Sequence, residues 1–336
     1  MKLVVIIPCH NEEAALAQTL ADLPSSLPGM AQIVTVVVDD GSTDRTQSIA
    51  RAGGAEVVAL PRRTGLAFAY RIGLAAALTR GADIIANTDG DNQYRGDNLA
   101  KLVDPIRRGD ADLVVGARPI AEIATFSPLK KWLQRAGTSV VNRLSGAMVD
   151  DATSGFRALS RRAAMLMNVH SRHTYTLETL IQAGQAGLRV ISVPIGVNPV
   201  TRPSRLIKST SGYVFRSALT MLRCYCLYRP FRFFCYPALA AFVLATLIGL
   251  RFLVDWWADG RAGHVQSLIL ASILFSLSGV LLLVGILGEL VAANRRLLEE
   301  IQAILREQHF KRGTRGGSGG AAGEPGNSEG TDAGIR

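Results

Sequence analysis

Residues 82–93 read Ala-Asp-Ile-Ile-Ala-Asn-Thr-Asp-Gly-Asp-Asn-Gln, and this stretch decides the fold. Its first half predicts a buried strand, which the chain leaves at Gly90. Asp89 and Asp91 lie two residues apart after this strand, so both carboxylates can converge at the carboxyl edge of a sheet, where open α/β sheets bind ligands. Together with the amide oxygen of Gln93 they form an all-oxygen donor set that suits Mg²⁺ or Mn²⁺.

The chain from residue 2 to about residue 117 alternates apolar runs with helical patterns. This alternation predicts a mostly parallel sheet with helices on both faces, a Rossmann-like α/β fold. Ser42 precedes an acidic residue and is expected to cap the second helix. The expected strands are 3–8, 33–39, 56–60, 84–88 and 113–117, and the expected helices are 12–23, 44–51, 65–80 and 97–107. Less regular residues continue this domain, with helices at 129–144 and 176–186, a loop at 150–157 and a last strand at 190–197.

Composition narrows the classes of function. The 336 residues carry a formal net charge of +10 and are 48% hydrophobic, which indicates one large domain with an apolar appendage and a polyanionic partner. Glycine-rich dinucleotide and P-loop motifs, a nucleophile elbow and zinc-ligand spacing are all absent from the sequence. We expect no nucleic-acid partner, because the basic residues gather beside apolar segments rather than among aromatic ones.

Two apolar segments, at about 234–254 and 268–290, each approach the ~20 residues that a helix needs to cross a bilayer. Arginines flank the pair on its outer sides, whereas Trp256 and Trp257 lie in the short loop between them. The positive-inside rule then predicts an integral membrane protein with its catalytic domain and both termini in the cytoplasm. No acidic residue occurs between Thr179 and Val254, so this region suits contact with anionic lipid.

These patterns predict five parts of the chain. Residues 1–209 form the α/β domain, and residues 210–232 form amphipathic juxtamembrane helices on the lipid surface. Two transmembrane helices fill 233–291 and a cytoplasmic amphipathic helix fills 292–312. The tail, 313–336, is rich in Gly, Ser, Ala and Glu and is expected to be disordered.

Two further acidic motifs follow the first two expected strands. Residues 8–12 read Pro-Cys-His-Asn-Glu, and residues 39–44 read Asp-Asp-Gly-Ser-Thr-Asp. In a parallel sheet, both motifs face the same crevice as the carboxylates after residue 88. So many carboxylates at one edge repel one another unless a cation or hydrogen-bond donors compensate, and a divalent ion with a nucleotide supplies both. The five are Glu12, Asp39, Asp40, Asp89 and Asp91.

The motifs resemble those of the inverting GT-A glycosyltransferases of family 2, and more closely those of polyprenol-phosphate sugar transferases of the dolichol-phosphate mannose synthase type. The similarity covers about residues 2–210 and also includes 65–70, 116–118 and 151–157. The paired apolar segments followed by residues 294–300 resemble the membrane anchor of the subgroup with bacterial undecaprenyl-phosphate glucosyltransferases. Relatives with this anchor imply a homo-oligomer.

The resemblance implies metal-dependent inverting transfer of one sugar from a nucleotide diphosphate sugar to polyprenyl phosphate at the cytoplasmic membrane face. It assigns the nucleotide sugar to Pro8, His10, Glu12, Asp39, Ser42, Asp89, Gly90 and Asp91, and the metal to Asp89, Asp91 and Gln93. It assigns the acceptor phosphate to Arg118, Arg135, Ser139, Arg202, Arg205 and Lys208. The expected catalytic set is Asp89, Asp91, Arg118 and Arg202, supported by Asp151 and Arg157.

Two assignments stay open at this point. The family's usual Arg-x-x-Gly-x-Ser-Lys segment departs from its pattern at residues 202–208, so either Arg205 or Lys208 supplies the second cation. Asp151 either orients Arg157 or acts as a base, and we favour orientation. A lipid phosphate has a second pKa of about 6 and is already largely ionised at neutral pH, so it needs a cationic cradle more than a base.

Two other functions are compatible with the sequence. One is a glycosyltransferase that acts on a hydroxyl of a glycolipid or saccharide, which requires a strong base near the acceptor. The other is a non-catalytic membrane adaptor with a decayed fold, against which the intact acidic motifs argue.

Overall fold

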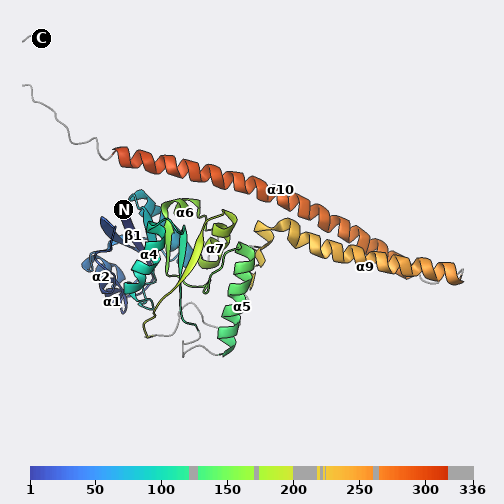
Figure 1. Cartoon of the computed structure of the whole chain (residues 1–336), viewed down its shortest axis with the longest axis horizontal. Helices are drawn as coiled ribbons and strands as arrows, with labels where there is room; N and C mark the ends of the chain where they lie inside the picture. The colour runs from blue at the N-terminus through green and yellow to red at the C-terminus, as the bar shows by residue number, and fades with distance from the viewer. Residues whose placement is uncertain are drawn as a thin grey trace, which may run out of the picture.

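The computed structural model describes residues 1–120, 128–169, 174–199, 218–219, 222–223, 225–259 and 265–316. Its α/β domain carries a long antiparallel helical hairpin, and the second helix of the hairpin runs back past the domain (Figure 1).

A seven-stranded sheet forms the centre of the domain, in the order β3-β2-β1-β4-β6-β5-β7. All neighbouring strands pair in parallel except β6, which is antiparallel to both β4 and β5. The predicted α/β class with a mostly parallel sheet is therefore confirmed. The strands are β1 (Lys2–Cys9), β2 (Gln32–Asp39), β3 (Glu56–Ala59), β4 (Ile84–Asn87), β5 (Leu113–Ala117), β6 (Arg157–Ser160) and β7 (Val190–Pro194).

Helices cover both faces of the sheet because its central strands are apolar on both sides. In β1, Val4 and Ile6 contribute to one hydrophobic core, whereas Leu3, Val5 and Ile7 contribute to the other. This division follows from the two-residue period of a strand. Helices α3 (Leu66–Thr79), α5 (Pro128–Ser145), α6 (Arg161–Leu166) and α7 (Thr176–Gln185) pack on the first core, and α1 (Leu16–Ala21), α2 (Thr46–Ala52) and α4 (Leu99–Arg107) on the second.

The strand β6 was not predicted, because four residues reading Arg-Ala-Leu-Ser show no apolar run and the segment before them resembles a loop. Arg157 begins this strand and pairs in register with Asn87 at the end of β4. The loop that precedes β6 therefore arrives at the carboxyl edge of β4, beside residues 88–93. An antiparallel insertion thus brings residues 151–156 to the predicted ligand-binding edge.

The starts of the first two helices differ from the prediction. The first begins at Leu16 rather than near residue 12, after a turn. The second begins at Thr46, and its Ncap residue makes no side-chain cap. Asp44 accepts a hydrogen bond from the Thr46 amide (3.0 Å), whereas the Ser42 hydroxyl accepts one from the Asn11 amide (2.8 Å). Ser42 as a helix cap was therefore wrong, because its hydroxyl joins the two acidic motifs instead.

The hairpin consists of α9 (Pro230–Asp259) and α10 (Val265–Gly316). Within them, Pro230–Trp257 and Val265–Arg295 are long and apolar enough to cross a bilayer, with mean hydropathies of 2.1 and 2.6. Small side chains bring the two helices together: Ala238 is buried between them, and its carbonyl accepts a hydrogen bond from the Ser278 hydroxyl (2.9 Å).

The last helix is longer than predicted. It continues without interruption from Val265 to Gly316, so the separate helix expected at 292–312 and the start of the expected tail belong to it. It turns back along α6 and α3 (Figure 1). The rest of the predicted tail, 317–336, lies outside the described residues, as do residues 210–217, 220, 221 and 224 of the juxtamembrane segment predicted at 210–232.

Close packing of α7 on the end of α5 depends on Gly184. A β-carbon at this position would overlap the carbonyl oxygen of Ser145. We expect Gly184→Ala to lower the thermal unfolding temperature of the detergent-solubilised protein, because an overpacking penalty of about 1–3 kcal/mol exceeds the modest helix preference of alanine. Gly279→Ala is the matched control, since no atom lies within 4 Å of that β-carbon position. Equal unfolding temperatures for the two variants would contradict the packing argument.

Candidate active site

Four carboxylates gather around the buried thiol of Cys9, at the carboxyl end of β1. Burial raises the pKa of Cys9 well above its ordinary value, and the negative charges of nearby acidic side chains raise it further. Gly90 lies against this group, since a β-carbon there would approach the Cys9 Sγ to 2.7 Å and the Glu12 Cγ to 3.4 Å. The carboxylates that act on the thiol are Glu12, Asp39, Asp89 and Asp91.

The first two acidic motifs are joined by hydrogen bonds from backbone amides to side-chain oxygens. The Glu12 amide donates to the Thr46 hydroxyl (2.8 Å), and the Thr43 amide donates to Asn11 Oδ1 (2.8 Å). Asn11 adopts a φ of 56°, a left-handed conformation that asparagine tolerates better than most residues. This turn holds residues 8–12 against residues 39–46, so the two motifs form one continuous wall of the site.

The two adjacent aspartates at the end of β2 have different surroundings. Asp40 accepts hydrogen bonds from the Thr64 amide (2.6 Å) and the Gly65 amide (2.8 Å), so it anchors the loop before α3. Asp39 accepts a hydrogen bond from Gln47 Nε2 (2.7 Å). The Nδ1 of His10 makes a 2.8 Å hydrogen bond with the carbonyl oxygen of Asp40.

Asp89 is the most perturbed carboxyl group of the site. Burial and the nearby charge of Asp91 raise its pKa to about 7, although Arg118 opposes the shift. No described residue donates a hydrogen bond to its carboxylate. Asp91 is partly buried and accepts a hydrogen bond from the Gln93 amide (3.1 Å). The site therefore contains concentrated negative charge that the protein compensates only in part.

This donor set fits a divalent cation. Within the described part of the chain, no three His, Cys, Asp or Glu side chains form a closed metal site. Asp89, Asp91 and Gln93 are all partly accessible, and the charge of Asp91 helps to raise the pKa of Asp89. An open pair of carboxylates is the arrangement in which Mg²⁺ keeps several waters and shares its remaining positions with substrate phosphates.

A buried ion pair stands beside the acidic group. Arg118 Nε donates to Asp151 Oδ2 (2.6 Å) and Nη2 donates to Oδ1 (3.2 Å). The side chains of Arg118 and Asp151 are only 9% and 0% exposed. Burial alone would raise the pKa of Asp151, but Arg118 and hydrogen bonds from Thr153 hold it below its ordinary value. An ionised carboxylate with both oxygens engaged is a poor general base.

Asp151 therefore orients Arg118, and the expectation that it orients Arg157 was wrong. Arg157 is fully buried and makes no described contact with a carboxylate. Its guanidinium instead donates to the carbonyl oxygens of Ala152, Ser154 and Thr176, and to the Thr179 hydroxyl. These four bonds tie the loop before β6 to the start of α7.

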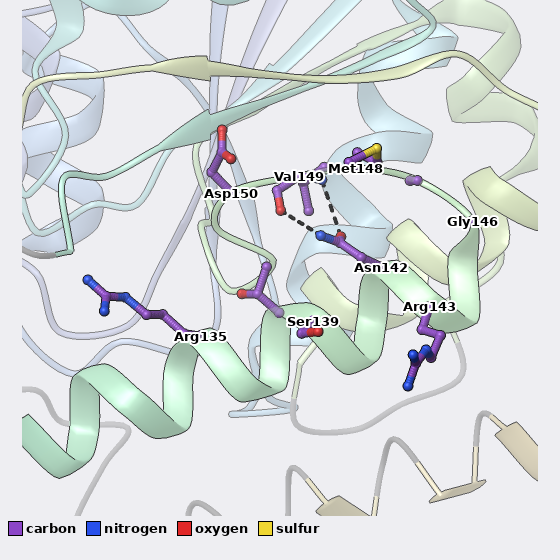
Figure 2. A pocket seen from close by; sticks show the side chains of 10 residues that line it. Arg135, Ser139, Asn142, Arg143, Gly146, Met148, Val149 and Asp150 are labelled. Atoms are coloured by element: carbon purple, nitrogen blue, oxygen red, sulfur yellow. Dashed lines mark hydrogen bonds between the residues drawn. The ribbon is translucent and has the colours of Figure 1, made fainter.

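The predicted acceptor residues fall into three groups. Arg135 and Ser139 are exposed on α5 and line a cavity of about 540 Å³ between that helix and residues 146–150 (Figure 2). Arg118 lies instead at the acidic group, although Thr153 links it to α5 by accepting hydrogen bonds from Arg118 Nη2 (2.8 Å) and Gln134 Nε2 (2.7 Å). The remaining acceptor residues, Arg202, Arg205 and Lys208, lie outside the described residues.

The cavity also contains residues that the sequence did not single out. Arg143 lies two turns after Arg135 on the same helix and lines the same cavity. Asn142 holds the opposite wall, because its side chain donates to the Val149 carbonyl (2.9 Å) and accepts from the Val149 amide (3.2 Å), as Figure 2 shows. The spacing of Arg135, Ser139 and Arg143 on one helix face was the available signal for the second arginine.

Comparison with known proteins finds relatives along most of the chain. The family described as glycosyl transferase family 2 matches residues 4–165. The low-salt glycan biosynthesis hexosyltransferase Agl6 of Haloferax volcanii is 33% identical over 79% of this chain, and the chain spans 62% of the length of that relative. The undecaprenyl-phosphate mannosyltransferase of Micrococcus luteus is 31% identical over 66% of this chain and 93% of its own length. The dolichyl-phosphate hexose transferase of Haloferax volcanii is 33% identical over 57% of this chain and 81% of its own length.

Solved structures share the fold. Glucosyl-3-phosphoglycerate synthase from Mycobacterium tuberculosis, in complex with uridine diphosphate, superposes with a TM-score of 0.52 at 24% identity over 66% of this chain and 80% of its own. The same enzyme with Mn²⁺ and UDP-glucose gives a TM-score of 0.51 at 23% identity, over 66% and 78%. At this level of identity the likeness establishes the GT-A type of fold.

The buried pair of Arg118 and Asp151 makes stability depend on pH. Asp151→Asn leaves the arginine charge buried without its partner, so we expect the free energy of unfolding at neutral pH to fall by about 3–5 kcal/mol. The folded-state pKa of Asp151 is lowered, so its contribution is present above the unfolded pKa of about 3.9 and is lost as pH falls through the folded value. The difference between wild type and variant should therefore shrink in acid. Denaturant unfolding as a function of pH measures it.

Asp110→Asn serves as the control for this experiment. Asp110 pairs with Arg108, but both side chains are more than half exposed, at 60% and 57%, so the pair should contribute little. A variant at Asp151 that is as stable as the Asp110 variant at neutral pH would contradict the role given to the buried pair.

Proposed function

The chain belongs to glycosyl transferase family 2, and on this premise we propose that it transfers one sugar from a nucleotide diphosphate sugar to a polyprenyl phosphate, with inversion. The observation that carries the proposal is the open carboxylate pair Asp89 and Asp91 beside the buried cation Arg118, at the carboxyl edge of the sheet. Relatives named as transferases to undecaprenyl phosphate and dolichyl phosphate support the acceptor class.

On the donor side, Asp89, Asp91 and Gln93 would hold the metal ion. A bound Mg²⁺ or Mn²⁺ supplies Lewis-acid stabilisation of the negative charge that grows on the departing diphosphate. The wall formed by residues 8–12 and 39–46 would bind the nucleoside, with Glu12 and Asp39 as acceptors for its hydroxyl and amine donors.

On the acceptor side, Arg118 is the cation that most lowers the pKa of Asp89. Two of its nitrogens bind Asp151 and Thr153, and its Nη1 has no hydrogen-bond acceptor among the described residues. This fixed orientation suits it to receive an oxygen of the acceptor phosphate. Arg135 and Ser139 on α5 would receive the same phosphate from a second side, and Arg202 with Arg205 or Lys208 would complete the cradle.

The state of Asp151 favours a phosphate acceptor over a hydroxyl acceptor. A hydroxyl nucleophile requires a base, whereas Asp151 is ion-paired and has a lowered pKa. A phosphate oxygen is already ionised and needs only alignment opposite the leaving group. We propose that the two apolar helices anchor the enzyme where this lipid acceptor resides, with the catalytic domain and both termini in the cytoplasm. The homo-oligomer stays a prediction.

Removal of one metal-binding carboxylate tests the reaction. We expect Asp91→Asn to reduce product formation by about two to three orders of magnitude, because the developing charge loses a preorganised stabiliser. Membranes are incubated with labelled nucleotide sugars, polyprenyl phosphate and Mn²⁺ or Mg²⁺, and the mild-acid-labile lipid product is counted. Asp104→Asn is the control with expected wild-type activity, because this carboxylate pairs with Arg107 on the solvent side of α4, where both side chains are partly exposed.

The identity of the product separates the alternatives. An acid-stable, hydroxyl-linked product would overturn the phosphate acceptor while keeping a glycosyltransferase. Equal turnover by Asp91→Asn and wild type would overturn the metal assignment, and absence of turnover with every donor sugar would favour a membrane adaptor.

Membrane orientation is tested by cysteine labelling. In a variant that lacks Cys9, Cys224, Cys226 and Cys235, we expect Asp259→Cys to react with an impermeant maleimide in intact cells, because it lies at the end of α9 next to the predicted external loop. Arg312→Cys, near the end of α10, should react only after the cells are opened. The opposite pattern would reverse the orientation.

A further inference from the structure

The Asp89 carboxylate rests against backbone rather than against a hydrogen-bond donor. A β-carbon built on Gly155 would lie 2.9 Å from Asp89 Oδ2 and 3.0 Å from Oδ1. No described residue donates a hydrogen bond to this carboxylate. Its orientation therefore depends on where the Gly155 backbone stands. Glycine is required here because any side chain would occupy the space of the carboxylate.

Three buried side chains form hydrogen bonds with the amide and the carbonyl oxygen of Gly155. Its amide donates to the Tyr94 hydroxyl (3.0 Å). Its carbonyl oxygen accepts from Asn87 Nδ2 (2.8 Å) and from the Tyr175 hydroxyl (3.4 Å). The Asn87 amide also donates to the Tyr175 hydroxyl (2.7 Å), which closes a small ring of hydrogen bonds behind the carboxylate.

Each member of the ring is buried, and contacts from other elements hold Tyr175 in place. Tyr175 is fully buried and stacks on Tyr70, with ring centroids 3.8 Å apart and planes at 6°. Arg157 binds the Thr176 carbonyl (2.7 Å), so it fixes the backbone next to Tyr175 at the start of α7. Asn87 Oδ1 is buried without a partner among the described residues, an unfavourable arrangement that leaves the side-chain amide oriented toward Gly155 and Tyr175.

We propose that Tyr175 and Asn87 are positioning residues for the metal-binding carboxylate: through Gly155 they set the direction in which Asp89 points. The inference rests on the proposed function, because it assigns Asp89 to the metal. Both side chains are fully buried, so neither is accessible to a substrate. They act as the outer groups around metal ligands do elsewhere, where their loss weakens metal affinity by about 10–100-fold.

The test compares two isosteric changes within one aromatic stack. Tyr175→Phe removes the hydroxyl that contacts Gly155, whereas Tyr70→Phe removes a hydroxyl that has no described hydrogen-bond partner and keeps the ring. Binding of Mn²⁺ is measured by electron paramagnetic resonance on the full detergent-solubilised chain, with UDP and with GDP. We expect Tyr175→Phe to weaken Mn²⁺ binding by about tenfold or more and Tyr70→Phe to bind as wild type does.

Gly155→Ala is a second, independent variant, since its methyl group would push the Asp89 carboxylate aside. We expect a loss of Mn²⁺ affinity of at least the same size, about tenfold. The apparent Mn²⁺ constant for activity should rise in parallel, with kcat recovering at saturating Mn²⁺ in Tyr175→Phe. A merely structural role would lower the unfolding temperature and leave Mn²⁺ affinity unchanged, and that result for Tyr175→Phe would overturn the proposal even if Gly155→Ala fails to fold.

Asp91→Asn is the reference that separates this inference from the proposed function. If wild type binds Mn²⁺ and Asp91→Asn does not, the metal assignment holds. The Mn²⁺ affinities of Tyr175→Phe and Tyr70→Phe then decide whether Tyr175 is a positioning residue. If wild type binds no Mn²⁺ with either nucleotide, or Asp91→Asn binds it equally well, the metal assignment fails and the positioning role fails with it.

Discussion

Electrostatic repulsion among carboxylates at one edge of the sheet is the constraint on which the site depends. Parallel β1, β2 and β4 deliver acidic side chains to the same edge, and burial removes the water that would screen them. The protein meets part of this charge with backbone amides at Asp40 and with Arg118 near Asp89. In the proposed function, the charge that remains on Asp89 and Asp91 would bind a divalent cation together with the substrate. In a domain with no ligand to bind, such a cluster of buried negative charges would only lower the stability of the fold.

The one antiparallel strand supplies the other half of the site. Because β6 runs opposite to its neighbours, the loop before it reaches the carboxyl edge of β4 rather than the far edge. That loop contributes Asp151, which orients Arg118, and Gly155, which forms the wall beside Asp89. Arg157 at the start of β6 then anchors the loop to α7 through buried carbonyl groups. The loop before β6 therefore helps to position both the Arg118 guanidinium and the Asp89 carboxylate.

The hydroxyl of Thr153 links Arg118 to α5. Thr153 accepts from Arg118 at the acidic group and from Gln134 on α5, the helix whose exposed face carries Arg135 and Ser139. In the proposed reaction, alignment of the two substrates would depend on how α5 packs on the loop before β6. The apolar hairpin of α9 and α10 adds a constraint of another kind, since both helices are long and apolar enough to cross a bilayer, and the proposed function places the lipid acceptor there. The long return of α10 along α6 and α3 joins that hairpin to the domain.

The sequence alone determined the class of fold, the acidic motifs and the apolar hairpin, because each is written in local patterns: strand–helix alternation, carboxylates at strand ends and uninterrupted apolar runs. It did not reveal β6, whose four residues Arg157–Ser160 carry no periodic signal and become a strand only by pairing with β4 and β5. It also paired Asp151 with the wrong arginine, because Arg118 is distant in sequence and its partner is chosen by the position of β6 in the sheet. Tyr175 belongs to no motif, and Asn87 lies in the 82–93 stretch but received no role from the sequence. Only the tertiary structure brings them to Gly155, since buried hydrogen bonds between distant segments follow from packing and leave no periodicity in the chain.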